Sequence, residues 1–154
     1  MMQYLTLVRH GEAERRESSA ADFGRPLTRR GLAEAADAAS RLRAQGVPLP
    51  DVVLTSPAAR ALETAETLAR ELGIAPRFVA RIDVLYLATP DLLASVVNGA
   101  DARIGHLLLV GHNPGISEYA RRLAPEIAPR SLPTGACVTL HCGAEGWQAV
   151  AADS

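Results

Sequence analysis

The segment Tyr4-Leu-Thr-Leu-Val-Arg-His-Gly11 is a short apolar run that ends abruptly in a basic residue and a histidine. Its leucines, valine and tyrosine favour a strand buried on both faces. Two further apolar runs, Val52–Thr55 and His106–Val110, have the same character, and the second is followed by His112. The chain therefore contains three predicted buried strands, and a histidine follows two of them.

Helical patterns lie between these strands. Thr28 is a favourable N-cap residue, and helical periodicity follows it as far as Gly46. The apolar positions of this predicted helix are Leu32, Ala35, Ala36, Ala39 and Leu42. A second helix is predicted after the second strand, with Pro57 in its first turn and Gly73 at its end. Its apolar positions are Ala61, Leu62, Ala65, Leu68 and Leu72.

Shorter elements complete the pattern. They are two helices, over 90–97 and 116–123, and three strands, over 78–80, 136–141 and 147–151, the last two of which form a hairpin. No repeat or linker divides the chain, so we expect one domain over residues 1–154. Alternation of strands and helices predicts an α/β fold, with a single mixed, mostly parallel sheet, helices on both faces and a C-terminal antiparallel hairpin.

Composition excludes several classes of protein. The chain has 154 residues, of which 48% are hydrophobic, enough for a folded core. Its 16 basic residues, all arginine, nearly balance 17 acidic ones, which disfavours binding to nucleic acid through phosphate contacts. The apolar runs are too short to span a membrane, and the N-terminal sequence does not resemble a secretory leader. We therefore expect a cytoplasmic protein without membrane or nucleic-acid partners.

Cysteine and histidine usage also carries information. Cys137 and Cys142 lie five residues apart on a predicted strand, so they face opposite sides and a disulfide between them is not expected. His106 and His141 fall within predicted strands, where a structural or surface role is expected. The two histidines that follow strands are different, because they lie where the chain leaves the sheet.

In α/β folds, ligands bind beyond the C-terminal ends of the strands. This rule places His10 and His112 on one rim of the sheet. Arg9 adjoins the first histidine, and Arg60 lies in the first turn of the helix after the second strand. Guanidinium groups bind phosphate oxygens through two parallel hydrogen bonds. The sequence therefore predicts an anion pocket that contains two imidazoles.

Backbone features support the same pocket. Helix N-termini that follow Pro57 and Gly115 present free amides to an anion. Gly11 and Gly111 are expected to allow close approach of the backbone to a ligand.

A neutral imidazole in such a pocket can attack phosphorus. Histidine has an ordinary pKa of about 6.5, and flanking arginines disfavour its protonation further. Attack would give a phosphohistidine, which water would then hydrolyse. A metal site built from His10, Glu12 and His112 is the alternative. Two nearby arginines would repel a cation, and no tight ligand spacing is present, so we expect no metal and no other cofactor.

Several segments resemble a known family. Residues Leu5-Thr-Leu-Val-Arg-His-Gly-Glu-Ala-Glu14 are similar to the signature of the histidine phosphatase superfamily, whose fold is phosphoglycerate mutase-like. Further segments resemble its small SixA-like branch of phosphohistidine phosphatases: Arg25-Pro-Leu-Thr-Arg-Arg-Gly31, Thr55-Ser-Pro-Ala-Ala-Arg-Ala-Leu-Glu-Thr-Ala65, Val110-Gly-His-Asn-Pro-Gly-Ile-Ser117 and Leu132-Pro-Thr-Gly-Ala136. The resemblance extends from the first predicted strand to the final hairpin.

The resemblance implies a role for each matching residue. His10 corresponds to the phosphorylated nucleophile, and Arg9 and Arg60 correspond to the phosphate-binding arginines. His112 corresponds to the second histidine, which holds the phosphoryl group and stabilises developing charge. Backbone amides near Gly11 and Asn113 complete the implied phosphate cradle.

A proton donor is harder to assign. Larger members of the family carry an acidic residue on an inserted segment, and the matching region here is short, Arg81-Ile-Asp-Val-Leu-Tyr-Leu-Ala-Thr-Pro90. Asp83 is a candidate acid, and a surface carboxylate is the alternative. An imidazole is easier to expel than an alkoxide, so a site weak in acid catalysis favours hydrolysis of N–P over O–P bonds.

Three functions follow from these observations. The first is a phosphohydrolase that acts through a covalent phosphohistidine on a phosphohistidine-bearing protein. The second is a small-molecule phosphatase or mutase on the same site. The third is a non-catalytic module that binds phosphoproteins, although such a module has little use for a neutral histidine nucleophile. Turnover of any phosphate compound separates the third from the other two.

Overall fold

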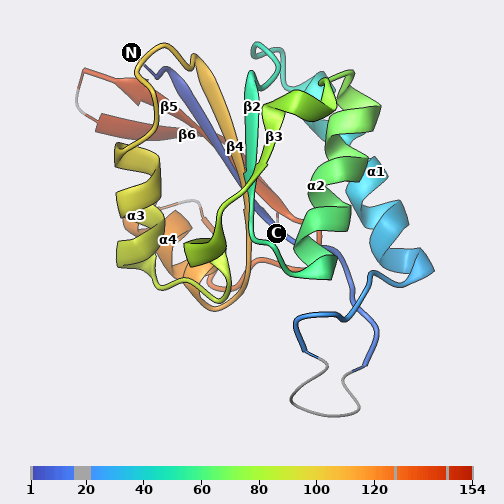
Figure 1. The fold of residues 1–154 in the computed structure, drawn as a ribbon. Helices are drawn as coiled ribbons and strands as arrows, with labels where there is room; N and C mark the ends of the chain where they lie inside the picture. Colours follow the sequence, from blue (N-terminus) through green and yellow to red (C-terminus); the bar gives the residue numbers. More distant parts are fainter. Residues whose placement is uncertain (1, 16–21, 127, 145, 154) are drawn as a thin grey trace.

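The computed structural model describes residues 2–15, 22–126, 128–144 and 146–153 (Figure 1). Within these residues one sheet has six strands, in the order β3-β2-β4-β1-β5-β6. The strands are β1 (Tyr4–Arg9), β2 (Val52–Thr55), β3 (Val79–Arg81), β4 (His106–Gly111), β5 (Cys137–Gly143) and β6 (Gly146–Ala152). Strands β1 to β4 run parallel, whereas β5 pairs antiparallel with both β1 and β6. The predicted mixed sheet with a C-terminal antiparallel pair is confirmed.

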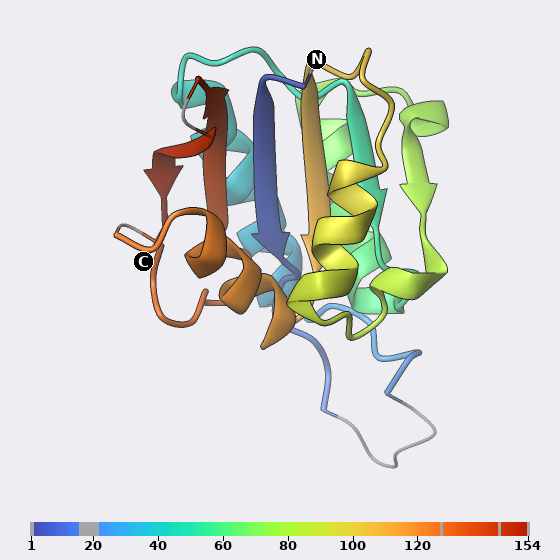
Figure 2. The same ribbon diagram turned by 90° about the vertical axis from the view of Figure 1, so that its left-hand side faces the viewer.

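Helices cover both faces of this sheet (Figures 1 and 2). One face carries α1 (Arg29–Ala44) and α2 (Ala59–Leu72), and the other carries α3 (Pro90–Asn98) and α4 (Gly115–Leu123). Two short 3₁₀ turns, η2 (Pro76–Phe78) and η3 (Asp83–Leu85), flank β3. The polar loop expected between β1 and α1 includes residues 16–21, which lie outside the described residues.

The central strands are buried on both faces because each face has its own core. Leu107 and Leu109 of β4 point towards α3 and α4, whereas Leu108 and Val110 point towards α1 and α2. Side chains of a strand alternate between its two faces, so a continuous apolar run such as β4 can only be buried between two layers of helices. These runs therefore fix the three-layer arrangement.

Two details of the predicted helices were wrong. Leu32 is 43% exposed, because the buried face of α1 is centred on Gly31, Ala35, Ala38 and Leu42 and leaves Leu32 at its edge. Pro57 precedes α2 rather than lying in its first turn, since the helix begins at Ala59 with Ala58 as its N-cap. The Thr28 N-cap is confirmed, because its side chain accepts a hydrogen bond from the Gly31 amide.

Close backbone contacts attach the loop after β1 to the start of α1. A Cβ atom on Gly31 would lie 2.1 Å from the carbonyl oxygen of Glu12, and one on Gly11 would lie 2.5 Å from the carbonyl oxygen of Gly31. Both distances are far below ordinary contact, so only glycine fits at either position. The contact holds the segment that carries His10 against the helix layer.

His106 has the structural role expected of it. Its Nδ1 donates to the carbonyl oxygen of Pro48 at 2.6 Å, and its Nε2 contacts the hydroxyl of Thr6 at 2.7 Å. Thr6 in turn contacts the Thr139 hydroxyl at 3.0 Å. This polar cluster lies inside the sheet, away from the strand ends that carry the other two histidines.

Two expectations from composition can also be compared with the structure. Cys137 is buried, Cys142 is half-buried, and both are free thiols, which confirms the prediction. None of the helices in the described ranges is long and apolar enough to cross a membrane.

Candidate active site

Parallel pairing brings the predicted site residues together. Arg9 at the end of β1 lies beside Gly111 at the end of β4, and Thr55 at the end of β2 lies beside Val110. His10 and His112 therefore leave the sheet from adjacent strands. Their ring centroids are 5.1 Å apart.

A cavity of about 440 Å³ lies at this edge of the sheet. Of the residues predicted for the site, Arg9, His10, Arg60, His112 and Asn113 line it, whereas Gly11, Gly111 and Asp83 do not. The lining residues are Arg9, His10, Glu12, Ala13, Asp22, Arg25, Arg60, Leu87, His112, Asn113 and Thr134.

His10 is held as a neutral ring with one free nitrogen lone pair. The side chain is 8% exposed, and its Nδ1 lies 2.7 Å from the carbonyl oxygen of Gly11. A carbonyl can only accept, so the proton of the neutral ring lies on Nδ1 and the lone pair on Nε2. Burial lowers the pKa of His10 to about 4, and the charges of Arg60 and Arg9 act in the same direction. At neutral pH, Nε2 therefore carries a free lone pair.

The two arginines reach the cavity from different elements, Arg9 from the end of β1 and Arg60 from the first turn of α2. Nη1 of Arg9 donates to the carbonyl oxygen of Leu132 at 2.9 Å. Arg60 is only 2% exposed; its Nη1 donates to the carbonyl oxygen of Asp22 at 2.8 Å, and its Nη2 lies 3.3 Å from Oδ2 of the same residue. Each guanidinium group is thereby fixed in orientation before any ligand is bound.

Three buried polar atoms at the site have no hydrogen-bond partner. They are Nε of Arg9, Nε of Arg60 and Nδ1 of His112, and Oε1 of Gln45 is the one other such side-chain atom in the described part of the chain. Buried polar groups in folded proteins are nearly always paired with protein, ordered water or a ligand, so three such atoms at one cavity mark it as a polar binding site. Oxygen atoms of a bound phosphoryl group would complete all three.

His112 is also neutral. Its Nε2 lies 2.7 Å from the hydroxyl oxygen of Ser56, the residue that follows β2. Burial lowers the pKa of His112 to about 3, with smaller contributions of the same sign from His10 and Arg60.

Sequence reasoning missed Asp22 and Tyr86. The Asp22 carboxylate accepts hydrogen bonds from Tyr86, Arg25 and Arg60, and these partners hold its pKa at about 2. The Tyr86 ring packs edge-on against His112, with centroids 5.6 Å apart. The one indication of Asp22 in the sequence is its place three residues before Arg25, where a segment that resembles the family begins. Only the folded loop shows that its carboxylate meets Arg60.

The expected role of Asp83 is not supported. Asp83 lies in η3, is exposed and does not line the cavity. The carboxylates that do line it in the described residues are Asp22 and Glu12. The sequence pattern cannot show which of these carboxylates reaches the cavity, because the position of Asp83 depends on how the chain turns after β3.

Neither of the two glycines predicted for the pocket lines the cavity. The Gly11 amide donates to the hydroxyl of Thr64 at 3.0 Å and so is not free for phosphate, which corrects its predicted place in the cradle. A Cβ atom on Gly111 would meet Ile116 at 3.4 Å. Asn113 does line the cavity, but its side-chain amide donates to Ser131 and to the Leu132 carbonyl, so it ties the neighbouring loop.

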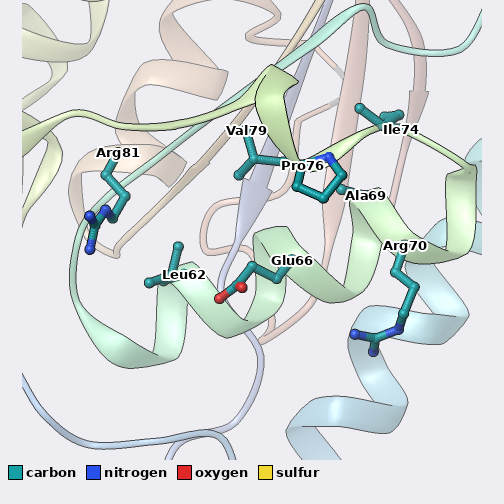
Figure 3. Close-up of a pocket in the computed structure, with 8 residues that line it drawn as sticks. All are labelled: Leu62, Glu66, Ala69, Arg70, Ile74, Pro76, Val79 and Arg81. Carbon is teal, nitrogen blue, oxygen red and sulfur yellow. The ribbon is translucent and has the colours of Figure 1, made fainter.

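A larger cavity, of about 590 Å³, lies between α2 and β3 and shares no residue with the histidine cavity (Figure 3). Its lining is Leu62, Glu66, Ala69, Arg70, Ile74, Pro76, Val79 and Arg81. Figure 3 shows an arginine at each end and, between them, aliphatic side chains together with the Glu66 carboxylate. It holds no nucleophile or histidine, so we place the active site at the smaller cavity. In the described parts of the chain, no group of three or more His, Cys, Asp or Glu side chains could hold a metal ion.

Comparison with known proteins agrees with this geometry. Residues 5–83 match the family model of the histidine phosphatase superfamily (branch 1). A protein from Picosynechococcus sp. is 36% identical over 134 residues, which cover 78% of this chain and 72% of the relative. A Mycobacterium tuberculosis protein is 41% identical over 105 residues, and the match covers 68% of this chain but only 62% of that protein. The solved structure of SixA from Agrobacterium tumefaciens superposes with a TM-score of 0.85 at 25% identity, covering 100% of this chain and 99% of the other.

The chain therefore belongs to the histidine phosphatase superfamily, and its fold is the phosphoglycerate mutase-like α/β fold. It is a phosphatase, and the similarity to SixA extends over the whole sheet and its helices.

Proposed function

We propose that this protein hydrolyses phosphohistidine on other proteins through a covalent phosphohistidine at His10, without a metal ion. The observation that carries the proposal is the convergence of one nucleophile with three unpaired donor positions. His10 presents the Nε2 lone pair, and Arg9, Arg60 and His112 each present a buried polar atom without a partner.

The reaction proceeds in two displacements. In the first, the Nε2 lone pair of His10 forms a bond to phosphorus, and the bond between phosphorus and the substrate nitrogen breaks, with its electron pair moving to that nitrogen. In the second, water attacks phosphorus, the bond between phosphorus and Nε2 of His10 breaks and its electron pair returns to Nε2; the proton lost by water passes to the solvent, and inorganic phosphate and neutral His10 are released. Arg9 and Arg60 stabilise the charge on the equatorial oxygens in both steps.

The ionisation of Asp22 supports an N–P substrate. A pKa of about 2 leaves Asp22 without a proton at neutral pH, so it cannot protonate an alkoxide leaving group. A phosphohistidine ring can carry a proton on its second nitrogen and then departs as neutral imidazole without an acid from the enzyme. The protein histidine phosphatase SixA, solved in complex with tungstate, shares this fold with a TM-score of 0.81.

The mouth of the cavity supports a protein-borne substrate. Leu87 lines the cavity and is 54% exposed, and Phe23, also exposed, packs against Tyr86. Apolar side chains exposed around a charged pocket favour contact with a protein surface over a free phosphate ester.

Glu12 keeps a second function open. Its carboxylate lines the cavity, accepts a hydrogen bond from Thr28 at 2.9 Å and could assist an oxygen leaving group. The alternative is thus a phosphatase or mutase that acts on a small phosphate ester.

A substrate panel decides between the two. We expect a higher kcat/KM for a phosphohistidine-bearing protein than for sugar phosphates or phosphoserine peptides, with and without EDTA. Efficient hydrolysis of one small ester with phosphohistidine untouched would establish the alternative. Loss of activity on EDTA treatment, restored by one added metal, would contradict the metal-free mechanism.

A further inference from the structure

Ser56 makes two contacts that together determine the state of His112. Its side chain is fully buried, at 0% exposure, directly after β2. The hydroxyl oxygen accepts a hydrogen bond from the Ala58 amide at 3.2 Å and lies 2.7 Å from Nε2 of His112. The contact with the Ala58 amide holds the Ser56 hydroxyl in place at the turn into α2, beside the ring of His112.

The hydrogen atoms of the Ala58 amide, the Ser56 hydroxyl and the His112 ring determine which ring nitrogen of His112 carries the proton. The Ala58 amide can only donate, so it occupies one lone pair of the hydroxyl. If Nε2 of His112 carried the ring proton, the hydroxyl would accept a second time, and its own hydrogen would be buried without an acceptor. Nδ1 would also be left as a bare lone pair. If the hydroxyl donates to Nε2 instead, its hydrogen is satisfied and the ring proton lies on Nδ1.

The second arrangement leaves one unpaired group, and that group belongs to a residue that lines the cavity. Nδ1 of His112 is one of the three buried site atoms without a partner. An N–H at this position can donate to a phosphoryl oxygen, whereas a lone pair would repel it. The protein thus leaves a donor unpaired only where a ligand can complete it.

We propose that Ser56 is a positioning residue that holds His112 as the Nδ1–H tautomer and so aims a neutral donor at the transferring phosphoryl group. The tautomer itself follows from the apo structure, and only the role of the donor rests on the proposed function. A neutral donor serves both displacements without changing its protonation. The lowered pKa of His112 is consistent with this, since the ring stays neutral across the neutral pH range.

The tautomer can be measured directly in the wild-type protein. Long-range ¹H–¹⁵N correlation spectra distinguish Nδ1–H from Nε2–H histidine rings, and His112 can be assigned by its loss in His112→Asn. We expect Nδ1–H for His112 in the absence of ligand. An Nε2–H ring would overturn the proposal, whatever the substrate of the enzyme.

Titration with inorganic phosphate tests the donor. We expect the Nδ1–H proton of His112 to shift on saturation; binding of phosphate that leaves this proton unchanged would overturn the donor role. Failure of phosphate to bind at all would overturn that role too and count against the proposed function, while the tautomer would stand on the ligand-free spectrum.

Matched variants test the catalytic consequence. Ser56→Ala removes the hydroxyl partner of His112, and Thr6→Val removes the hydroxyl partner of His106. We expect Ser56→Ala to lower kcat by at least about tenfold, as loss of a transition-state donor does, and to populate the Nε2–H ring. Thr6→Val should leave kcat unchanged. A smaller loss in Ser56→Ala, or an equal loss in Thr6→Val, would overturn the role of Ser56; the wild-type spectrum still decides if Ser56→Ala does not fold.

Discussion

Acid should destabilise this protein at a pH well above that at which its carboxylates titrate. His10, His106 and His112 are buried, and burial lowers the pKa of each below its ordinary value of 6.5. In the unfolded chain these rings take up protons near pH 6.5, whereas in the fold they stay neutral. Their contribution to stability is therefore complete above pH 6.5 and is lost as the pH falls.

The size of the loss follows from two of these pKa values. His10 and His112 titrate at about 4 and about 3 in the folded state. At pH 5 each is mainly neutral in the fold and mainly protonated in the unfolded chain, so each lowers the free energy of unfolding by about 2 kcal/mol relative to pH 8. Together they remove about 4 kcal/mol, a large part of the roughly 5–15 kcal/mol that stabilises a typical domain. His106 adds to the loss in the same direction.

Urea unfolding in phosphate-free buffer between pH 5 and pH 8 measures this. We expect the free energy of unfolding to fall steeply below pH 6.5, and the His112→Asn variant to lose about 2 kcal/mol of that dependence. The variant is a suitable control because asparagine does not titrate. A free energy that stays flat from pH 8 to pH 5 would show that the rings accept protons in the fold, and the argument for neutral histidines would be refuted.

Three further predictions concern single residues. Arg60→Ala should lower kcat/KM by about a hundredfold to a thousandfold. Arg60→Lys should stay at least about tenfold below wild type, because an ammonium group cannot bind two oxygens side by side. Full activity with lysine would show that charge alone suffices. Gly31→Ala should sharply lower the thermal midpoint, because its Cβ would lie 2.1 Å from the Glu12 carbonyl, and an unchanged midpoint would contradict that contact. Asp83→Asn should leave kcat/KM for both N–P and O–P substrates within about twofold, since surface changes away from the site have small effects; a selective loss on O–P substrates would restore Asp83 as an acid.

The sheet and the histidine pair could be predicted because both depend on simple rules. A continuous apolar run such as β4 exposes apolar side chains on both faces of the sheet, so a layer of helices must cover each face. The C-terminal ends of parallel strands lie at the same edge of the sheet. His10 and His112 follow two such strands, so the sequence alone predicts that the two histidines lie close together. The lining of the cavity by Arg60 was predicted in the same way, from the turn after β2.

The remaining features depend on contacts between distant loops. Asp22 meets Arg60 and Tyr86 only because the segment before α1, the first turn of α2 and the segment after η3 come together in the fold. Asp83 was selected as an acid from its place in the chain, and the turn at η3 leaves it exposed. Gly11 was assigned to phosphate, yet its amide is used by Thr64. Local sequence cannot show which of two possible partners a group selects. The extent of the domain, the cytoplasmic location and the absence of nucleic-acid partners stay predictions.

The central claim is that phosphoryl transfer passes through His10, and rapid quenching tests it most directly. Wild-type protein would be mixed with a radiolabelled phosphohistidine protein, quenched within the first turnover and digested to locate the label. We expect label on the peptide that contains His10, labile to acid and stable to base, and no label and no turnover in folded His10→Ala. Turnover without a labelled intermediate, or label on any other residue, would contradict the account.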